Sequence, residues 1–148
     1  MTRQLCTFRV GPLLYGVDVL DVQEVISEQP LTRVPLSARE LRGLINLRGQ
    51  IVSAIDLRRR LGLEDGDTDM PPMNVVVRID GAAASFLVDE IGDVVEVDET
   101  QAAAVPDTVP EPARRLVVEV YKFERELLHV IDARRAASLP ALTGTVNR

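Results

Sequence analysis

Apolar and polar residues alternate in many short stretches of the chain, and turn residues separate these stretches. Alternation with a period of two is typical of a strand that is buried on one face. Residues 21–26 are ambiguous between a helical turn and a strand. The remaining stretches predict strands over residues 5–10, 13–19, 44–47, 51–55, 74–80, 83–88, 93–97, 116–123 and 127–132. Their number and spacing indicate a mainly β protein.

Short helices are predicted in three places. Ser37 followed by Glu40 matches a capping box, and Gly43 would end that helix. Asp56 can cap a second helix over residues 57–61, and a third is expected over residues 133–138.

The remaining segments are predicted to be loops. The stretch 100–115 contains three prolines and is expected to be a long exposed loop, and the segment beyond Pro140 is expected to fray. The acidic stretch 64–73 looks like a connector. Its spaced aspartates resemble the opening of a calcium loop, but Met70 and Val76 stand where that loop needs Gly and Glu, so calcium binding is not expected.

The two halves of the chain repeat one another in order. Val17-Asp18 matches Val88-Asp89 at an offset of 71, and Ile55-Asp56 matches Ile131-Asp132 at an offset of 76. A matched order with a slowly drifting offset indicates duplication. Residues 4–63 and 74–138 are therefore expected to form two β units of about five strands each, small barrels by the spacing of strands and turns.

The two halves are expected to form one domain over residues 1–148, because a unit of about 65 residues buries too little core to be stable alone. The strand assignment leaves open whether strands are exchanged between the halves. A groove between two packed halves would suit a docked protein. The segment 42–50 has no clear counterpart in the second half and is predicted to break the symmetry.

Composition excludes several classes of protein. Apolar content is 46%, as in a globular protein, and no apolar run is long enough to span a membrane. Cys6 is the only cysteine, which excludes a disulfide framework, and the N-terminus lacks a signal sequence. The chain is therefore predicted to be cytoplasmic. Residues 1–63 carry nine basic and six acidic groups, whereas residues 64–148 carry eight and seventeen, which suggests two surfaces with different partners or simply solvated surface.

Catalytic signals are absent from the sequence. His129 is the only histidine, and it is expected to be an outward-facing or hydrogen-bonded side chain rather than a ligand. Glu24 and Glu96 are related by the repeat, so structural equivalence explains them better than acid–base chemistry. No phosphate loop or nucleophile elbow appears. The sequence therefore predicts no enzyme, no metal and no cofactor.

Nucleic-acid binding is another function that the sequence raises. Seven arginines are concentrated between residues 33 and 60, but the chain has a single lysine, a net charge of −6 and few aromatic residues. Proteins that bind nucleic acid combine a basic surface with stacking aromatic side chains. No nucleic-acid partner is expected.

Arg48 interrupts an apolar stretch at the centre of the most distinctive segment, Arg42-Gly43-Leu44-Ile45-Asn46-Leu47-Arg48-Gly49-Gln50. A guanidinium stays charged at ordinary pH, and its desolvation is costly without a partner. Two interpretations follow. Arg48 pairs within the chain, for instance with Glu24, or another molecule binds it, and both hold if Glu24 orients Arg48.

This segment and its surroundings resemble the CheW family of chemotaxis coupling proteins. The resemblance covers residues 5–137 and is carried by the Gly-Leu-Ile-Asn-Leu-Arg-Gly run after Val34-Pro35, and by Val22-Gln23-Glu24-Val25-Ile26, Ile55-Asp56-Leu57-Arg58 and Val88-Asp89. It implies an all-β fold of two pseudo-symmetric, five-stranded SH3-like barrels packed together, with a short helix after each barrel.

The resemblance also implies a function. CheW proteins are non-enzymatic adaptors that couple the cytoplasmic tips of methyl-accepting chemoreceptors to the regulatory domain of the histidine kinase CheA. A CheW-like scaffold of a non-flagellar pathway is the alternative. Neither case requires insertion into the membrane. The implied receptor-binding residues are Val22, Glu24, Gly43, Asn46, Leu47, Arg48 and Gly49, with Val88 and Ile91 opposite.

The chain departs from the family pattern at two places. Ser53 stands where the family usually has Pro, and Glu119-Val120-Tyr121 stands where a strand with Gly is usual. The second half is generally less typical than the first. The implied receptor contacts are therefore better defined than the kinase contacts, which the resemblance does not place by residue.

Overall fold

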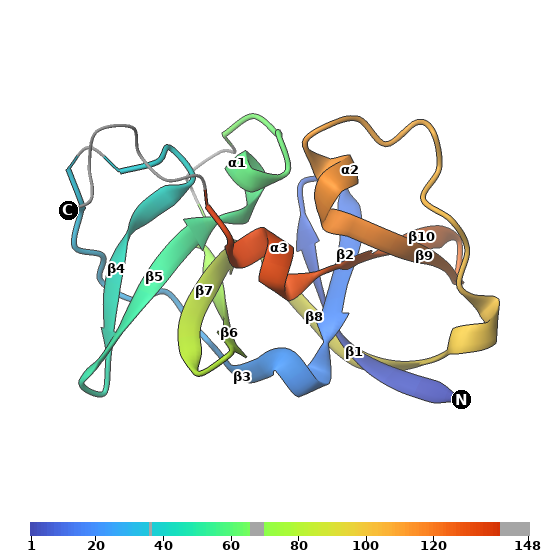
Figure 1. The fold of residues 1–148 in the computed structure, drawn as a ribbon, viewed down its shortest axis with the longest axis horizontal. Coiled ribbons are helices and arrows are strands. Elements are labelled where there is room, and N and C mark those ends of the chain that lie inside the picture. Colours follow the sequence, from blue (N-terminus) through green and yellow to red (C-terminus); the bar gives the residue numbers. More distant parts are fainter. Residues whose placement is uncertain (36, 66–69, 140–148) are drawn as a thin grey trace.

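The computed structural model describes residues 1–35, 37–65 and 70–139, and in these residues the chain forms two five-stranded sheets (Figure 1). The first half contains β1 (Thr2–Val10), β2 (Leu13–Asp18), β3 (Val22–Ile26), β4 (Leu41–Leu47) and β5 (Gln50–Asp56). The second contains β6 (Met73–Ile79), β7 (Ala82–Val88), β8 (Glu90–Asp98), β9 (Val117–Phe123) and β10 (Glu126–Ile131). The short helices are η1 (Val19–Asp21), α1 (Leu57–Arg60), η2 (Glu99–Gln101), α2 (Ala113–Leu116) and α3 (Ala133–Ala137).

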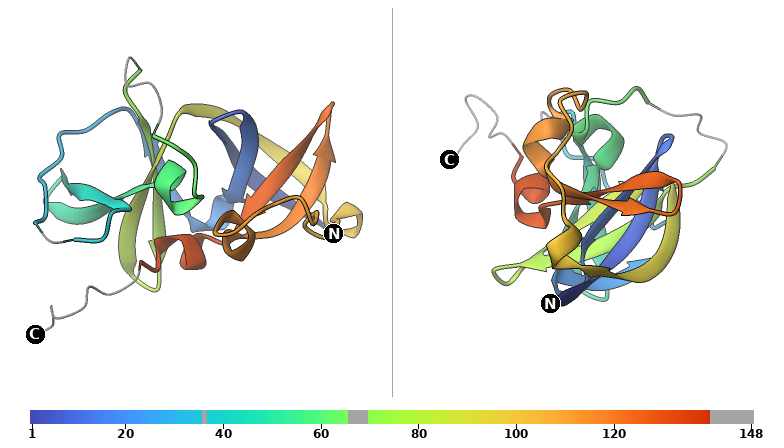
Figure 2. Two further views of the ribbon diagram at one scale, coloured as in Figure 1. Left: turned by 90° about the horizontal axis from the view of Figure 1, so that it is seen from above. Right: turned by 90° about the vertical axis from the view of Figure 1, so that its right-hand side faces the viewer.

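The two sheets have the same topology. One has the order β8-β1-β2-β10-β9 and the other the order β3-β6-β7-β5-β4. Adding five to each strand number of the second order, and starting again at β1 after β10, gives the first order. Each sheet curls into a small barrel, and the two barrels lie side by side (Figures 1 and 2). We call them barrel 1 (β1, β2, β8, β9 and β10) and barrel 2 (β3 to β7). The predicted all-β fold of two pseudo-symmetric barrels is confirmed.

Neither barrel corresponds to one continuous half of the sequence. The segments 4–63 and 74–138 each contribute strands to both barrels, because β1 and β2 pair with β8 and β10, whereas β6 and β7 pair with β3 and β5. The links are antiparallel at β1–β8 and β3–β6, and parallel at β2–β10 and β5–β7. Separating the barrels would therefore break pairs between strands that are far apart in sequence.

The registers identify which residues of the two barrels are equivalent. In barrel 1 the parallel pair β2–β10 places His129 beside Tyr15, and in barrel 2 the pair β5–β7 places Ser53 beside Ala84. The offset of 76 that relates Ser53 to His129 also relates β4 to β9. The expectation that residues 42–50 lack a counterpart is therefore wrong, since β9, its turn and the start of β10 occupy the equivalent place.

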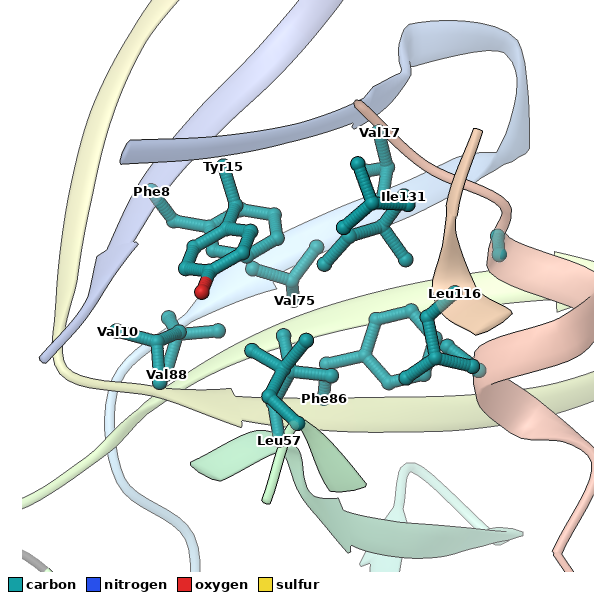
Figure 3. Close-up of a cluster of buried hydrophobic side chains, with 14 of the residues drawn as sticks. Phe8, Val10, Tyr15, Val17, Leu57, Val75, Phe86, Val88, Leu116 and Ile131 are labelled. Atoms are coloured by element: carbon teal, nitrogen blue, oxygen red, sulfur yellow. The ribbon is translucent and has the colours of Figure 1, made fainter. Parts of the chain in front are cut away.

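An apolar core lies between the barrels (Figure 3). Phe8, Tyr15 and Val17 of barrel 1 pack toward Val75 and Phe86 of barrel 2, and each is at most 2% exposed. Burying a side chain of this size contributes about 1.5–3 kcal/mol relative to leaving it in water. Each barrel also has a small interior cluster of its own. The shared core, rather than either interior, therefore holds the domain together.

Helices α1 and α3 follow equivalent strands and begin in the same way. Asp56 accepts a hydrogen bond from the Arg59 backbone N–H at 3.2 Å, and Asp132 accepts one from Arg135 N–H at 3.1 Å. A side-chain acceptor at this position satisfies a backbone donor that the first helical turn leaves unpaired. These two predicted helices are confirmed.

The helix predicted after Ser37 is wrong. The Ser37 hydroxyl donates to the Val34 carbonyl at 2.8 Å, and β4 already begins at Leu41. Gly43 lies within β4 instead of ending a helix. A Cβ there would stand 2.6 Å from the Thr32 carbonyl oxygen, so the residue allows the preceding loop to pass close to the strand.

Two further expectations change with the structure. The stretch 100–115 is not only loop, because it contains most of α2, whose Ala113 and Leu116 are buried, and Ala103 bridges to Val120. His129 does not face outward: it is 6% exposed, its ring centroid lies 5.4 Å from that of Tyr15, and its Nδ1 donates to the Leu14 carbonyl at 3.0 Å. The alternative expectation of a hydrogen-bonded histidine is confirmed.

Asp67, Asp69 and the segment beyond Pro140 lie outside the described residues.

Candidate functional site

The hairpin of β4 and β5 ends in a tight turn at Arg48-Gly49. Both residues have positive φ, 53° at Arg48 and 87° at Gly49, which matches the twist of a two-residue hairpin. The Asn46 side-chain oxygen accepts a hydrogen bond from the Gly49 N–H at 2.9 Å and holds the turn closed. The sequence run Asn-Leu-Arg-Gly therefore encodes a rigid turn that presents an arginine at its tip.

Arg48 is paired within the chain and still open to solvent. Its guanidinium donates to the carboxylate of Glu24 on β3, while 66% of the Arg48 side chain and 23% of the Glu24 side chain remain exposed. Because β3 and β4 are the two outer strands of the sheet, this contact joins them across the open side of barrel 2. Both interpretations of Arg48 thus have support: Glu24 orients it, and its exposed side stays accessible.

Glu24 is held in its charged form by two donors. The Gln23 side-chain amide donates to the same carboxylate at 3.1 Å, and this bond, together with that from Arg48, lowers the pKa of Glu24 below its ordinary value. A carboxylate that accepts hydrogen bonds in its ionised form titrates at lower pH. The Arg48–Glu24 pair is therefore intact throughout the neutral range.

The polar network extends to side chains that the sequence did not single out. Arg78 on β6 donates to the Gln23 side-chain oxygen at 2.7 Å and to that of Gln50 at 3.4 Å. Arg78 also donates to the Gly81 carbonyl at 3.0 Å. Only the pairing of β3 with β6 brings these groups together. One signal in the sequence could have marked Arg78: Val77-Arg78-Ile79 resembles Phe8-Arg9-Val10 at an offset of 69, in line with the internal repeat.

The predicted receptor-binding residues separate into exposed and buried groups. Asn46, Arg48 and Gly49 are exposed at one end of barrel 2, with Glu24 half-buried beside them. Gly43, Leu47 and Val88 are buried, and Leu47 belongs to the interior of barrel 2. Val22 and Ile91 are half-buried and pack against the core between the barrels. The structure does not bring all of these residues together: the parallel pairing of β5 with β7 places Val88 beyond Asp56, at the other end of barrel 2 from the Arg48 turn, and Ile91 pairs with Phe8 in barrel 1.

A separate cavity of about 510 Å³ lies beside α1 and is lined by charged side chains. Its three arginines are each paired with a carboxylate: Arg42 with Asp56 at 3.0 Å, Arg58 with Asp89 at 2.7 Å, and Arg59 with Asp65 at 3.0 Å. Their charge is compensated, so the cavity does not attract anions. These arginines are among the seven that suggested nucleic-acid binding in the sequence, and their pairing with carboxylates argues against that function.

Neither a metal-binding cluster nor a membrane-spanning helix is found in the part of the chain that the structure describes. No group of three or more His, Cys, Asp or Glu side chains in residues 1–35, 37–65 and 70–139 is arranged to hold a metal ion. Within the same residues, no helix has the length and apolar character needed to cross a bilayer.

Comparison with known proteins decides the family. The profile of the CheW-like domain matches residues 4–141, and this stretch contains both barrels and the Arg48 hairpin. The chain belongs to the CheW family. The Bacillus subtilis chemotaxis protein CheW is 30% identical over 130 residues, which cover 88% of this chain and 83% of that protein. CheW of Treponema pallidum is 26% identical and covers 97% of this chain, with 87% of its own length matched.

The fold of a solved CheW protein agrees with this assignment. The crystal structure of the scaffolding protein TtCheW from Thermoanaerobacter tengcongensis superimposes with a TM-score of 0.83 at 27% identity. The match covers 94% of this chain and 90% of that one, so the two-barrel architecture is shared over almost its whole extent.

Proposed function

We propose that this protein is a non-enzymatic adaptor that couples the cytoplasmic tips of chemoreceptors to the histidine kinase CheA in a chemotaxis-type pathway. Membership of the CheW family supports this proposal, as does the structural similarity to the scaffolding protein TtCheW. The observation that carries it is the Arg48 hairpin, where a rigid turn presents a largely exposed guanidinium that Glu24 already orients.

The receptor site is proposed to centre on Glu24, Asn46, Arg48 and Gly49. A guanidinium presents several donors in a fixed plane, so a docked helix can supply a carboxylate or carbonyl oxygens to the groups that Glu24 leaves free. Gly49 carries no side chain, which lets a partner backbone approach the turn. Val22 on β3 and Gly43 and Leu47 on β4 belong to the strands that carry this surface and would support it, whereas Val88 and Ile91 lie away from it and are proposed as a separate part of the receptor contact.

Arg48→Ala tests the receptor contact. Charge-assisted hydrogen bonds contribute about 1.5–3 kcal/mol, so the affinity for a receptor signalling fragment should fall by about tenfold or more. Arg125→Ala is the matched control, because Arg125 occupies the equivalent hairpin turn of barrel 1 and is also exposed. Equal pull-down of the fragment by the wild type and Arg48→Ala would contradict the assignment.

Kinase binding is tested separately. Calorimetry with the regulatory domain of CheA should detect a complex at tens of micromolar protein, and Arg48→Ala should bind the kinase domain as the wild type does. Absence of that complex would remove the coupling role while leaving the family assignment intact. The alternative is that the protein serves a non-flagellar chemosensory pathway. That pathway would use the same two kinds of partner, so only the identity of the receptor that binds would distinguish it.

A further inference from the structure

Barrel 2 has a small apolar groove on its surface. It has a volume of about 300 Å³ and lies where β5 and β7 meet the end of α3. Its principal lining residues are Ser53 and Ile55 from β5, Ala82 and Ala84 from β7, and Ala137 and Leu139 from the end of the chain that the structure describes. Most of these side chains are partly exposed, so the groove opens to solvent.

The pseudo-symmetry shows why this groove is empty. Ser53 and Ala84 are neighbours across the parallel strands β5 and β7, and their equivalents in barrel 1 are His129 and Tyr15. In barrel 1 the two rings contact each other and are almost fully buried. The groove is therefore the space that two aromatic rings occupy in one barrel and that a hydroxyl and a methyl group leave open in the other.

The surroundings of the groove keep its character apolar and neutral. Asp80 and Arg134, which flank its lining residues in the β6–β7 turn and in α3, form an ion pair with one another. Continuing the register of Ser53 and Ala84 by two residues places Ile51 beside Ala82, and Ile51 is 61% exposed. An exposed apolar side chain next to an apolar hollow is the arrangement of a protein contact site.

We propose that this groove binds an aromatic side chain that a protein partner inserts from outside. The groove has the shape of an aromatic side chain, since the rings of Tyr15 and His129 fill the equivalent place in barrel 1. The compensated charges of Asp80 and Arg134 favour a neutral ring over a charged group, and the Ser53 hydroxyl supplies one polar contact for a phenol. Inserted aromatic side chains are common anchors of protein interfaces.

This site shares no residue with the receptor surface around Arg48. It also does not depend on the coupling role, because the test uses the protein alone with a small probe. Failure of the probe to bind would leave the receptor and kinase assays unaffected, and failure of those assays would leave the groove unaffected.

The test is a titration of the full chain with N-acetyl-L-tyrosinamide, followed by ¹H–¹⁵N NMR. Shifts confined to amides of β5, β7 and α3, saturating in the millimolar range expected of a fragment-sized ligand, support the proposal. N-acetyl-L-leucinamide should shift the same amides at least threefold more weakly. Absent or scattered shifts with the tyrosine probe would overturn it.

Two filled variants provide the specificity test. The double variant Ser53→His with Ala84→Tyr reproduces the ring pair of barrel 1 and should abolish the shifts, and Ala84→Tyr alone should weaken them at least tenfold. Ala104→Tyr, at an exposed position outside the groove, should bind the probe as the wild type does. Binding that persists in a folded filled variant contradicts the site.

A peptide distinguishes a partner's side chain from a free small molecule. Gly-Gly-Tyr-Gly-Gly should bind at least as tightly as the free amide, because the open groove leaves room for a backbone on both sides. Binding of the free amide without binding of the peptide would mean a small-molecule pocket and would overturn the proposed protein partner.

Discussion

Asp56 and Asp132 make the same helix cap in unequal surroundings, and this difference sets the first prediction. Both accept a backbone N–H at the start of a helix, but the Asp56 side chain is 8% exposed and that of Asp132 is 37% exposed. Asp56 also accepts a hydrogen bond from Arg42 at 3.0 Å. Replacing each aspartate by alanine therefore removes one cap in both cases and a half-buried ion pair in only one.

The magnitudes follow from these contacts. Losing an N-cap costs about 1 kcal/mol, which is the whole expected effect of Asp132→Ala. Asp56→Ala also removes the bond from Arg42 and leaves a small void. Because Arg42 reaches solvent, this second loss is limited to about 1–2 kcal/mol. The expected total for Asp56→Ala is about 2–3 kcal/mol, and Asp56→Asn, which keeps an oxygen acceptor for the cap, should lose about 1–2 kcal/mol.

Urea unfolding followed by circular dichroism measures these differences. All variants should unfold with the same m-value, so the free energies of unfolding can be compared directly. For a domain of this size, each 1 kcal/mol corresponds to a fall in Tm of about 2–4 °C. Equal losses for Asp56→Ala and Asp132→Ala would refute the reasoning, because they would mean that the half-buried Arg42–Asp56 ion pair adds nothing to the cap.

Three further predictions rest on single features. Gly62→Ala should reduce thermal stability, because Gly62 has a φ of 79° and a Cβ would lie 2.4 Å from the Pro112 ring; Gly81→Ala, with a similar φ but open space, should cost less in the same melt. Phe86→Ala should lower the free energy of unfolding by about 3–5 kcal/mol in urea, since it empties the core between the barrels. Burial acts to raise the pKa of Asp89, but hydrogen bonds from Arg58 and the Gly11 N–H outweigh it and hold that pKa below its ordinary value. Stability from Asp89 is thus present above its unfolded pKa and lost as pH falls through the lower folded value, so Asp89→Asn should flatten the acid limb of a stability–pH curve.

The parts of the fold that depend on neighbouring residues could be predicted from the sequence. The helix over residues 57–61 with its Asp56 cap and the helix over residues 133–138 both appear where the local sequence placed them, as α1 and α3. The pattern after Ser37 failed because tertiary pairing won: the Glu40 carbonyl accepts a hydrogen bond from Asp56 N–H at 2.7 Å, and the chain continues as a strand. The residues around Ser37 cannot reveal this competing partner, because Asp56 lies sixteen residues after Glu40 in the sequence.

The site was predictable only in part, for the same reason. The Arg48–Glu24 pair was one of the two stated interpretations, and it joins residues that a short motif had marked. Gln23, Gln50 and Arg78 were missed because their contacts require β3 to pair with β6, a strand from the other half of the chain. The groove beside Ser53 was beyond prediction, because its cause is visible only when the two barrels are placed in register.

The comparison of the barrels explains why the candidate sites gather on barrel 2. Arg9 and Glu126 form a bidentate ion pair in barrel 1, at 2.7 and 3.1 Å, whereas the equivalent residues of barrel 2 are Arg78 and Gln50, at 3.4 Å. A neutral partner at Gln50 leaves Arg78 free to bond Gln23, which in turn bonds Glu24 and so supports Arg48. Since the backbone topology is the same in both barrels, a few substitutions at equivalent positions account for the difference. At these equivalent positions barrel 1 pairs its arginine with a carboxylate and fills the space with two rings, whereas barrel 2 keeps an exposed arginine and an open groove.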